Sequence, residues 1–90
     1  MGPRIARVYV TLKHGVLDPQ GQAVHGALGR LGNTFVKDVR IGKYIELTLD
    51  AAAPRDAAAL DASLRKMCEG LLANTVIEQF RWEITEGDAR

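Results

Sequence analysis

The run KHGVLDPQG, residues 13–21, sets the order of the elements around it. Asp18 is suited to a helix N-cap, because its carboxylate accepts hydrogen bonds from the free N–H groups of a first turn. Pro19 fits the first helical position, where its missing donor costs nothing. The run therefore predicts that a strand ends before Asp18 and that a helix begins directly after it.

Residues 4–14 alternate between apolar and polar, which is the period of a half-buried strand. The side predicted to face the core carries Ala6, Val8, Val10 and Leu12. After Asp18, apolar residues recur at helical spacing at Val24, Leu28 and Leu31, and Gly32 supplies a C-terminal stop. Within this helix Gly21, Gly26 and Gly29 each cost up to about 1 kcal/mol relative to Ala, which favours close packing against a neighbouring backbone.

Two further strands are predicted at residues 34–41 and 44–50, joined by a tight hairpin turn at Gly42-Lys43. In the second strand Ile45, Leu47 and Leu49 alternate cleanly with polar residues. The apolar residues of the first strand do not share one face, so its register stays open and it is either an edge strand or a bulged one.

A second helix is predicted from residue 57, and a last strand follows it. The apolar positions of this helix are Leu60, Leu64, Met67 and Leu71, and Asn74 is placed at its close. Phe80, Trp82 and Ile84 then alternate with polar residues. Residues 1–90 are expected to form a single domain, with residues 85–90 as a frayed tail.

This order of elements predicts an α+β, ferredoxin-like βαββαβ fold with both helices on one face of an antiparallel sheet. The other face is then left uncovered, as antiparallel sheets allow. It is predicted to carry Arg7, Tyr9, Thr11, Lys13, Tyr44, Glu46, Thr48, Arg81 and Glu83. This face is either bare surface or an oligomer interface, for which the candidates are Tyr9, Thr11, Tyr44 and Glu46.

Composition excludes several functional classes. Lys and Arg number 12 against 11 Asp and Glu, which gives no electrostatic case for nucleic acid or an anionic membrane. One Cys forms no internal disulfide, and the two His residues show no zinc spacing with it. No apolar run approaches the roughly 20 residues of a membrane-spanning helix, and no signal peptide is evident. The expected compartment is the cytoplasm.

No residue stands out as a catalytic or metal-binding group. Cys68 is predicted to pack as a small apolar residue in mid-helix, without a base to activate it. His14 and His25 have no acidic partner at a spacing typical of a triad or a metal site. Gly42-Lys43 lacks the longer glycine-rich loop and the helix of a phosphate-binding motif.

Four runs together carry a family resemblance: VTLK at residues 10–13, GVLDPQG at 15–21, VRIGKYIEL at 39–47 and CEGLLANTVIE at 68–78. In this order they closely resemble the PurS subunit family of phosphoribosylformylglycinamidine synthase. The likeness spans almost the whole chain, except the two ends and the alanine-rich residues 51–59. Each run alone is a weak signal, whereas the combination is specific.

The resemblance implies a non-catalytic subunit in the fourth step of purine synthesis. It implies two partners, a glutaminase (PurQ-type) and a synthetase (PurL-type) that holds ATP and magnesium, with no cofactor on this chain. PurS would bridge them, assist ammonia transfer and form a homodimer or homotetramer. The candidate partner-interface residues are Lys13, Asp18, Gln20, Arg40, Lys43 and Asn74. Of these, Lys13, Arg40 and Lys43 are exposed charges for which no role in folding comparable to the Asp18 cap is expected.

Two other functions share this order of elements. A free-standing ferredoxin-like regulatory module that senses a small molecule would need a ligand pocket at a dimer interface. An RNA-binding module is disfavoured, because no strand carries the paired exposed aromatic residues of that fold. Co-purification with a large synthetase and a glutaminase distinguishes the assembly subunit from both.

Overall fold

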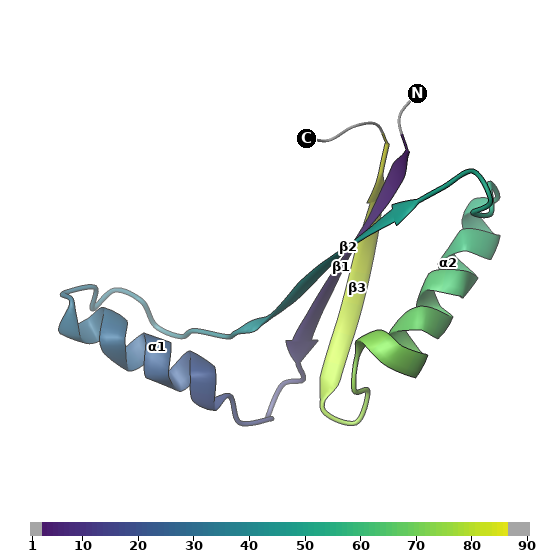
Figure 1. Cartoon of the computed structure of the whole chain (residues 1–90). Coiled ribbons are helices and arrows are strands. Elements are labelled where there is room, and N and C mark those ends of the chain that lie inside the picture. Colours follow the sequence, from purple (N-terminus) through teal and green to yellow (C-terminus); the bar gives the residue numbers. More distant parts are fainter. Residues whose placement is uncertain (1–2, 87–90) are drawn as a thin grey trace.

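The computed structural model describes residues 3–86 of the chain (Figure 1). The elements are β1 Arg4–Leu12, α1 Pro19–Arg30, β2 Gly42–Leu49, α2 Ala57–Met67, the π-helical turn η1 Cys68–Leu72, and β3 Glu78–Thr85. The three strands form one antiparallel sheet in the order β2-β1-β3. The predicted α+β class with an antiparallel sheet is confirmed.

The core lies between α2 and one face of this sheet. From β1, Ala6, Val8 and Val10 are buried against Leu64 of α2 and Cys68 of η1. The half-buried residues around them are Ile45, Leu47, Leu49, Phe80, Trp82 and Ile84. The predicted inward sides of all three strands are therefore confirmed.

Helix α2 departs from the predicted pattern at its C-terminal end. Met67 and Leu71 were expected on the apolar side with Leu60 and Leu64, yet they are 41% and 84% exposed. The α-helix ends at Met67 and the chain continues as η1, whose wider i to i+5 turn changes which side chains face the sheet. Cys68 is buried instead, and Asn74 follows η1 rather than closing α2.

The predicted strand over residues 34–41 and its hairpin turn at Gly42-Lys43 are wrong. Residues 36–41 have no regular secondary structure, and Gly42 is the first residue of β2, paired with Thr11 of β1. The physical reason is that Val36, Val39 and Ile41 have no period of two, so the segment has no single apolar face to bury.

The prediction that both helices cover the sheet is wrong for α1, which stands away from the sheet beyond the end of β1 (Figure 1). Gly21 is the buried residue of α1. Residues 31–41 return beside the helix (Figure 1), and we call α1 together with these residues the arm. The radius of gyration is 16.7 Å, whereas a compact domain of this length has about 12 Å.

The ends of α1 follow the sequence signals. Asp18 caps the first turn, and the chain leaves the helix at Gly32 with a φ of 97°. The Asn33 N–H then donates to the Leu28 carbonyl at 2.9 Å, which satisfies a free C-terminal carbonyl. At the end of the chain Thr85 still pairs with Ile5, and the predicted tail from residue 87 onward lies outside the described residues.

Candidate functional site

Three segments meet at the end of the sheet where β1 ends and β2 and β3 begin. They are residues 13–21, 39–43 and 72–78, and we call their meeting point the junction. The Lys13 N–H donates to the Ile77 carbonyl at 2.8 Å, and Lys43 Nζ donates to the Leu72 carbonyl at 3.2 Å. All six residues predicted to contact partners belong to these segments, so the structure brings them to one end of the sheet, where the arm begins.

Asp18 is the centre of the junction. Its Oδ1 accepts from the Gly21 N–H at 2.9 Å, which is the predicted cap, and its Oδ2 accepts from the Ile41 N–H at 2.8 Å. The side chain is 5% exposed, and buried polar groups are normally paired in this way. The bonds from Ile41 and then Gly21 lower the pKa of Asp18. The carboxylate therefore binds the start of the arm to its end.

Arg40 also binds the end of the arm to the segment that precedes it. Its guanidinium donates to the carbonyls of Lys13 at 3.2 Å, Val16 at 3.4 Å and Leu12 at 3.5 Å. The expectation that Arg40 and Lys43 have no role in folding is thus wrong, because both side chains bind carbonyls of other segments. Sequence reasoning missed these bonds because their partners lie 24 to 29 residues away.

The remaining candidates have different surroundings. Gln20 is exposed in the first turn of α1, and with Asp18 and Lys43 it lines a hollow of about 300 Å³. The Asn74 N–H donates to Glu78 at 2.7 Å, and its side-chain oxygen accepts from the Val76 N–H at 3.1 Å. Asn74 therefore builds the turn that leads into β3.

The junction consists of side chains that hold backbone rather than groups arranged for a reaction. Within residues 3–86, no three His, Cys, Asp or Glu side chains are grouped to hold a metal ion. Burial raises the pKa of the Cys68 thiol, which keeps it protonated and unreactive at neutral pH. What the junction can do is set the position of the arm.

The face of the sheet opposite α2 carries all four candidate oligomer residues. Tyr9 lies opposite Tyr44 in the β1–β2 register, with ring centroids 5.3 Å apart. Arg7 donates to the Tyr44 hydroxyl at 2.6 Å and pairs with Glu46 at 3.0 Å. These contacts make this open face an ordered polar and aromatic surface.

On the open face, Tyr9 of β1 also contacts side chains of β3. Its hydroxyl donates to Glu83 at 2.7 Å, which raises the pKa of Tyr9, and the Arg81 guanidinium lies 4.1 Å from the Tyr9 ring centroid. Thr11 lies two residues after Tyr9 on the same face of β1, and the Gln79 side-chain amide donates to its hydroxyl at 3.4 Å. The rings and charges of all three strands are therefore linked on this side.

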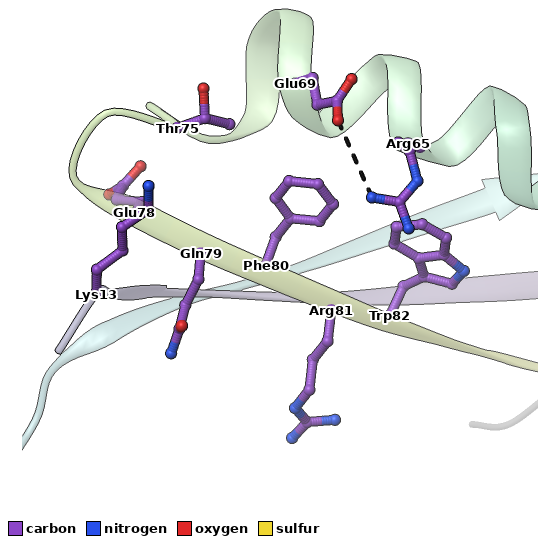
Figure 2. Close-up of a pocket in the computed structure, with 9 residues that line it drawn as sticks. All are labelled: Lys13, Arg65, Glu69, Thr75, Glu78, Gln79, Phe80, Arg81 and Trp82. Carbon is purple, nitrogen blue, oxygen red and sulfur yellow. Dashed lines mark ion pairs between the residues drawn. The ribbon is translucent and has the colours of Figure 1, made fainter.

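A groove runs between α2 and β3, and sequence reasoning did not identify it as a site. It measures about 550 Å³, and Figure 2 shows Arg65 of α2 and Glu69 of η1 on the side facing Phe80 and Trp82 of β3. Lys13 stands at one end of it (Figure 2). The available signal was the aromatic pair two residues apart on the last strand.

The described part of the chain contains no helix that combines the length and the apolar character needed to cross a bilayer. Its fold and sites define a small α+β subunit whose polar side chains anchor its own loops, with apolar and aromatic surface left open to other chains. The chain belongs to the PurS family: the model of this family, described as phosphoribosylformylglycinamidine (FGAM) synthase, matches residues 5–86.

Known relatives agree with this assignment. The chain is 55% identical over 80 residues to the Bacillus subtilis phosphoribosylformylglycinamidine synthase subunit PurS, covering 89% of this chain and 90% of that protein. The solved Methanocaldococcus jannaschii PurS, described as one of the subunits of formylglycinamide ribonucleotide amidotransferase in the purine biosynthetic pathway, is 30% identical. Its TM-score is 0.80, with 94% of this chain and 99% of that chain covered.

A third relative is a chain of the solved structure of PurLQS from Thermotoga maritima, with a TM-score of 0.76 and 27% identity. The match covers 92% of this chain and 99% of that one. The family and the function that the sequence motifs predicted, a subunit of FGAM synthase in purine biosynthesis, are confirmed.

Proposed function

We propose that this chain is the non-catalytic assembly subunit that joins a PurL-type synthetase to a PurQ-type glutaminase in the cytoplasm. In this role it assists the protected transfer of ammonia between them, while ATP and magnesium belong to the synthetase and this chain needs no cofactor. The likeness to a chain of the PurLQS structure supports the choice of partners. Neither nucleic acid nor a membrane is a partner in this proposal.

The observation that carries the proposal is the large apolar surface of the arm. Leu31 and Phe35 are 77% and 83% exposed, and Leu17, in the junction segment that leads into the arm, is also exposed. Exposing such side chains costs roughly 25 cal/mol for each Å² of apolar surface. Apolar residues gathered on one exposed segment are typical of a surface that another chain covers.

A second copy of this chain is the proposed occupant of part of that surface. The sequence pattern predicts a helix on the sheet, yet α1 stands away from its own sheet (Figure 1). Exchange of arms between two copies would place each helix on the sheet of the other and satisfy the same pattern. The open face with Tyr9, Thr11, Tyr44 and Glu46 offers a second contact, which would extend a homodimer to a homotetramer.

Reconstitution tests the proposal. The isolated chain is expected to show neither glutaminase nor ATP-dependent activity, whereas glutamine-driven FGAM formation by the two larger subunits should depend on it. Cys68→Ser should leave this support largely intact, because the buried, protonated thiol packs in the core and takes no part in the chemistry. Equal turnover with and without the chain would overturn the proposal, and tight binding of a small molecule by the isolated chain would then favour the sensing module.

A further inference from the structure

The groove between α2 and β3 has a preformed apolar floor. The rings of Phe80 and Trp82 are stacked with centroids 5.9 Å apart and an interplanar angle of 11°. Trp82 Nε1 donates to Asp61 Oδ1 at 3.0 Å, which holds the indole in place. Both residues are only half-buried. The floor is therefore ordered before anything binds, which lowers the entropic cost of binding.

One wall of the groove presents a cation. The Arg65 guanidinium carbon lies 5.4 Å from the Trp82 ring centroid and 5.8 Å from that of Phe80. Arg65 forms an ion pair with Glu69, with Nη1 and Oε2 4.0 Å apart, which is too far for a hydrogen bond (Figure 2). A guanidinium carries five N–H donors in a planar fork that matches a carboxylate. The guanidinium is thus complementary to a carboxylate that enters the groove and replaces Glu69 as its partner.

The strand beside the groove can accept another strand. In the order β2-β1-β3, β3 is an edge of the sheet, with β1 on one side only. An exposed edge presents backbone N–H and carbonyl groups to which an extended segment can add. Phe80 and Trp82 point toward α2, and Arg81 points away from it (Figure 2). Every second side chain of an added strand would therefore face the groove.

We propose that the groove binds an extended segment of one of the larger synthase subunits by strand addition to β3. The segment carries an apolar side chain that packs on Phe80 and Trp82, and an acidic side chain, two residues away, that binds Arg65. This inference rests on the proposed function, because the occupant is a subunit of that complex.

Complex assembly with purified synthetase and glutaminase tests the groove. Arg65→Glu should weaken the binding of this chain about tenfold or more, since a charge-assisted hydrogen bond is lost and repulsion is added. The matched control is Lys66→Glu, which makes the same charge change at the next, exposed position of α2. It should bind as the wild type does. Arg65→Glu also loses the contacts of Arg65 with the two rings and its ion pair with Glu69, so its melting temperature should fall modestly, and binding is compared at a temperature at which both variants are folded.

Two local measurements locate the occupant. Trp82 is the single tryptophan of the chain, so a chain labelled with 5-fluorotryptophan should show a shifted ¹⁹F resonance on assembly. Amide exchange of residues 78–85 should slow at the same time. If the wild type assembles while Trp82, β3 and the Arg65→Glu affinity are unchanged, the groove proposal is overturned and the assembly role stands.

Two other outcomes are distinct. A wild-type chain that does not assemble at all contradicts the proposed function itself. Protection of β3 that appears in the isolated chain as its concentration rises would assign the groove to a second copy, and this overturns the choice of a larger subunit.

Discussion

At the scale of single residues, Asp18 does more than its position in the sequence indicates. A cap needs one acceptor, and the Asp18 carboxylate uses its second oxygen to bind Ile41 at the other end of the arm. Asp56 is the matched comparison, because it caps α2 through the Ala59 N–H at 2.9 Å and is exposed. The two aspartates share one local function, and only Asp18 adds a link between distant segments.

Asp18→Asn should lower stability, whereas Asp56→Asn should be nearly neutral. Asn caps a helix about as well as Asp, but its single acceptor oxygen cannot serve both Gly21 and Ile41. The measurement is the free energy of unfolding in urea at neutral pH. Equal stability of the two variants would show that the bond to Ile41 contributes nothing.

The same pair of variants has a defined pH dependence. The folded-state pKa of Asp18 lies below the unfolded value of about 3.9, so its stabilisation is complete above that value and is lost as the pH falls through the folded pKa. The difference in unfolding free energy between wild type and Asp18→Asn should therefore shrink below about pH 4. A difference that stays constant down to pH 2 would contradict the role of the ionised carboxylate.

At the scale of elements, the three glycines of α1 differ in the space around them. An added Cβ at Gly21 would lie 2.3 Å from the Val39 carbonyl oxygen and 2.7 Å from Asp18 Oδ2. At Gly29 it would meet nothing within 4 Å, and at Gly26 it would make an ordinary contact with Arg30. The predicted close packing against a neighbouring backbone thus holds for Gly21 and is wrong for Gly26 and Gly29.

Gly21→Ala should destabilise the protein by about 1 to 3 kcal/mol through overpacking against the returning segment. Gly29→Ala should instead stabilise it, by up to about 1 kcal/mol, because Ala is the better helix former and its methyl group meets open space. Thermal unfolding of the two variants and the wild type measures both changes in stability, which should have opposite signs. A stabilising Gly21→Ala would mean that Val39 is not held against α1.

At the scale of the whole molecule, the arm predicts an oligomer. The isolated wild-type chain should sediment above the monomer mass, and Phe35→Asp should shift it toward the monomer, because a charge cannot be buried in the apolar contact. Leu71→Asp is the control, since Leu71 is equally exposed but lies on η1. A wild-type monomer at high micromolar concentration, or an unchanged mass for Phe35→Asp, would remove the second copy from the arm.

The sequence by itself determined the local features of the fold. The inward sides of the three strands, the cap at Asp18, the stop at Gly32 and the core residues Leu60 and Leu64 of α2 were predicted correctly, because each depends on residues a few positions apart. The family was also predicted, since its motifs are runs of neighbouring residues. The strand predicted at residues 34–41 failed where that local period was irregular.

The tertiary structure alone decided where the arm lies and what holds it there. The bond from Ile41 to Asp18 and those from Arg40 to the end of β1 join residues 23 to 28 positions apart. Such contacts depend on the path of the intervening chain, which side-chain periodicity does not specify. The groove between α2 and β3 has the same origin: Arg65 reaches the rings of Phe80 and Trp82 only because α2 packs across the sheet beside its edge strand.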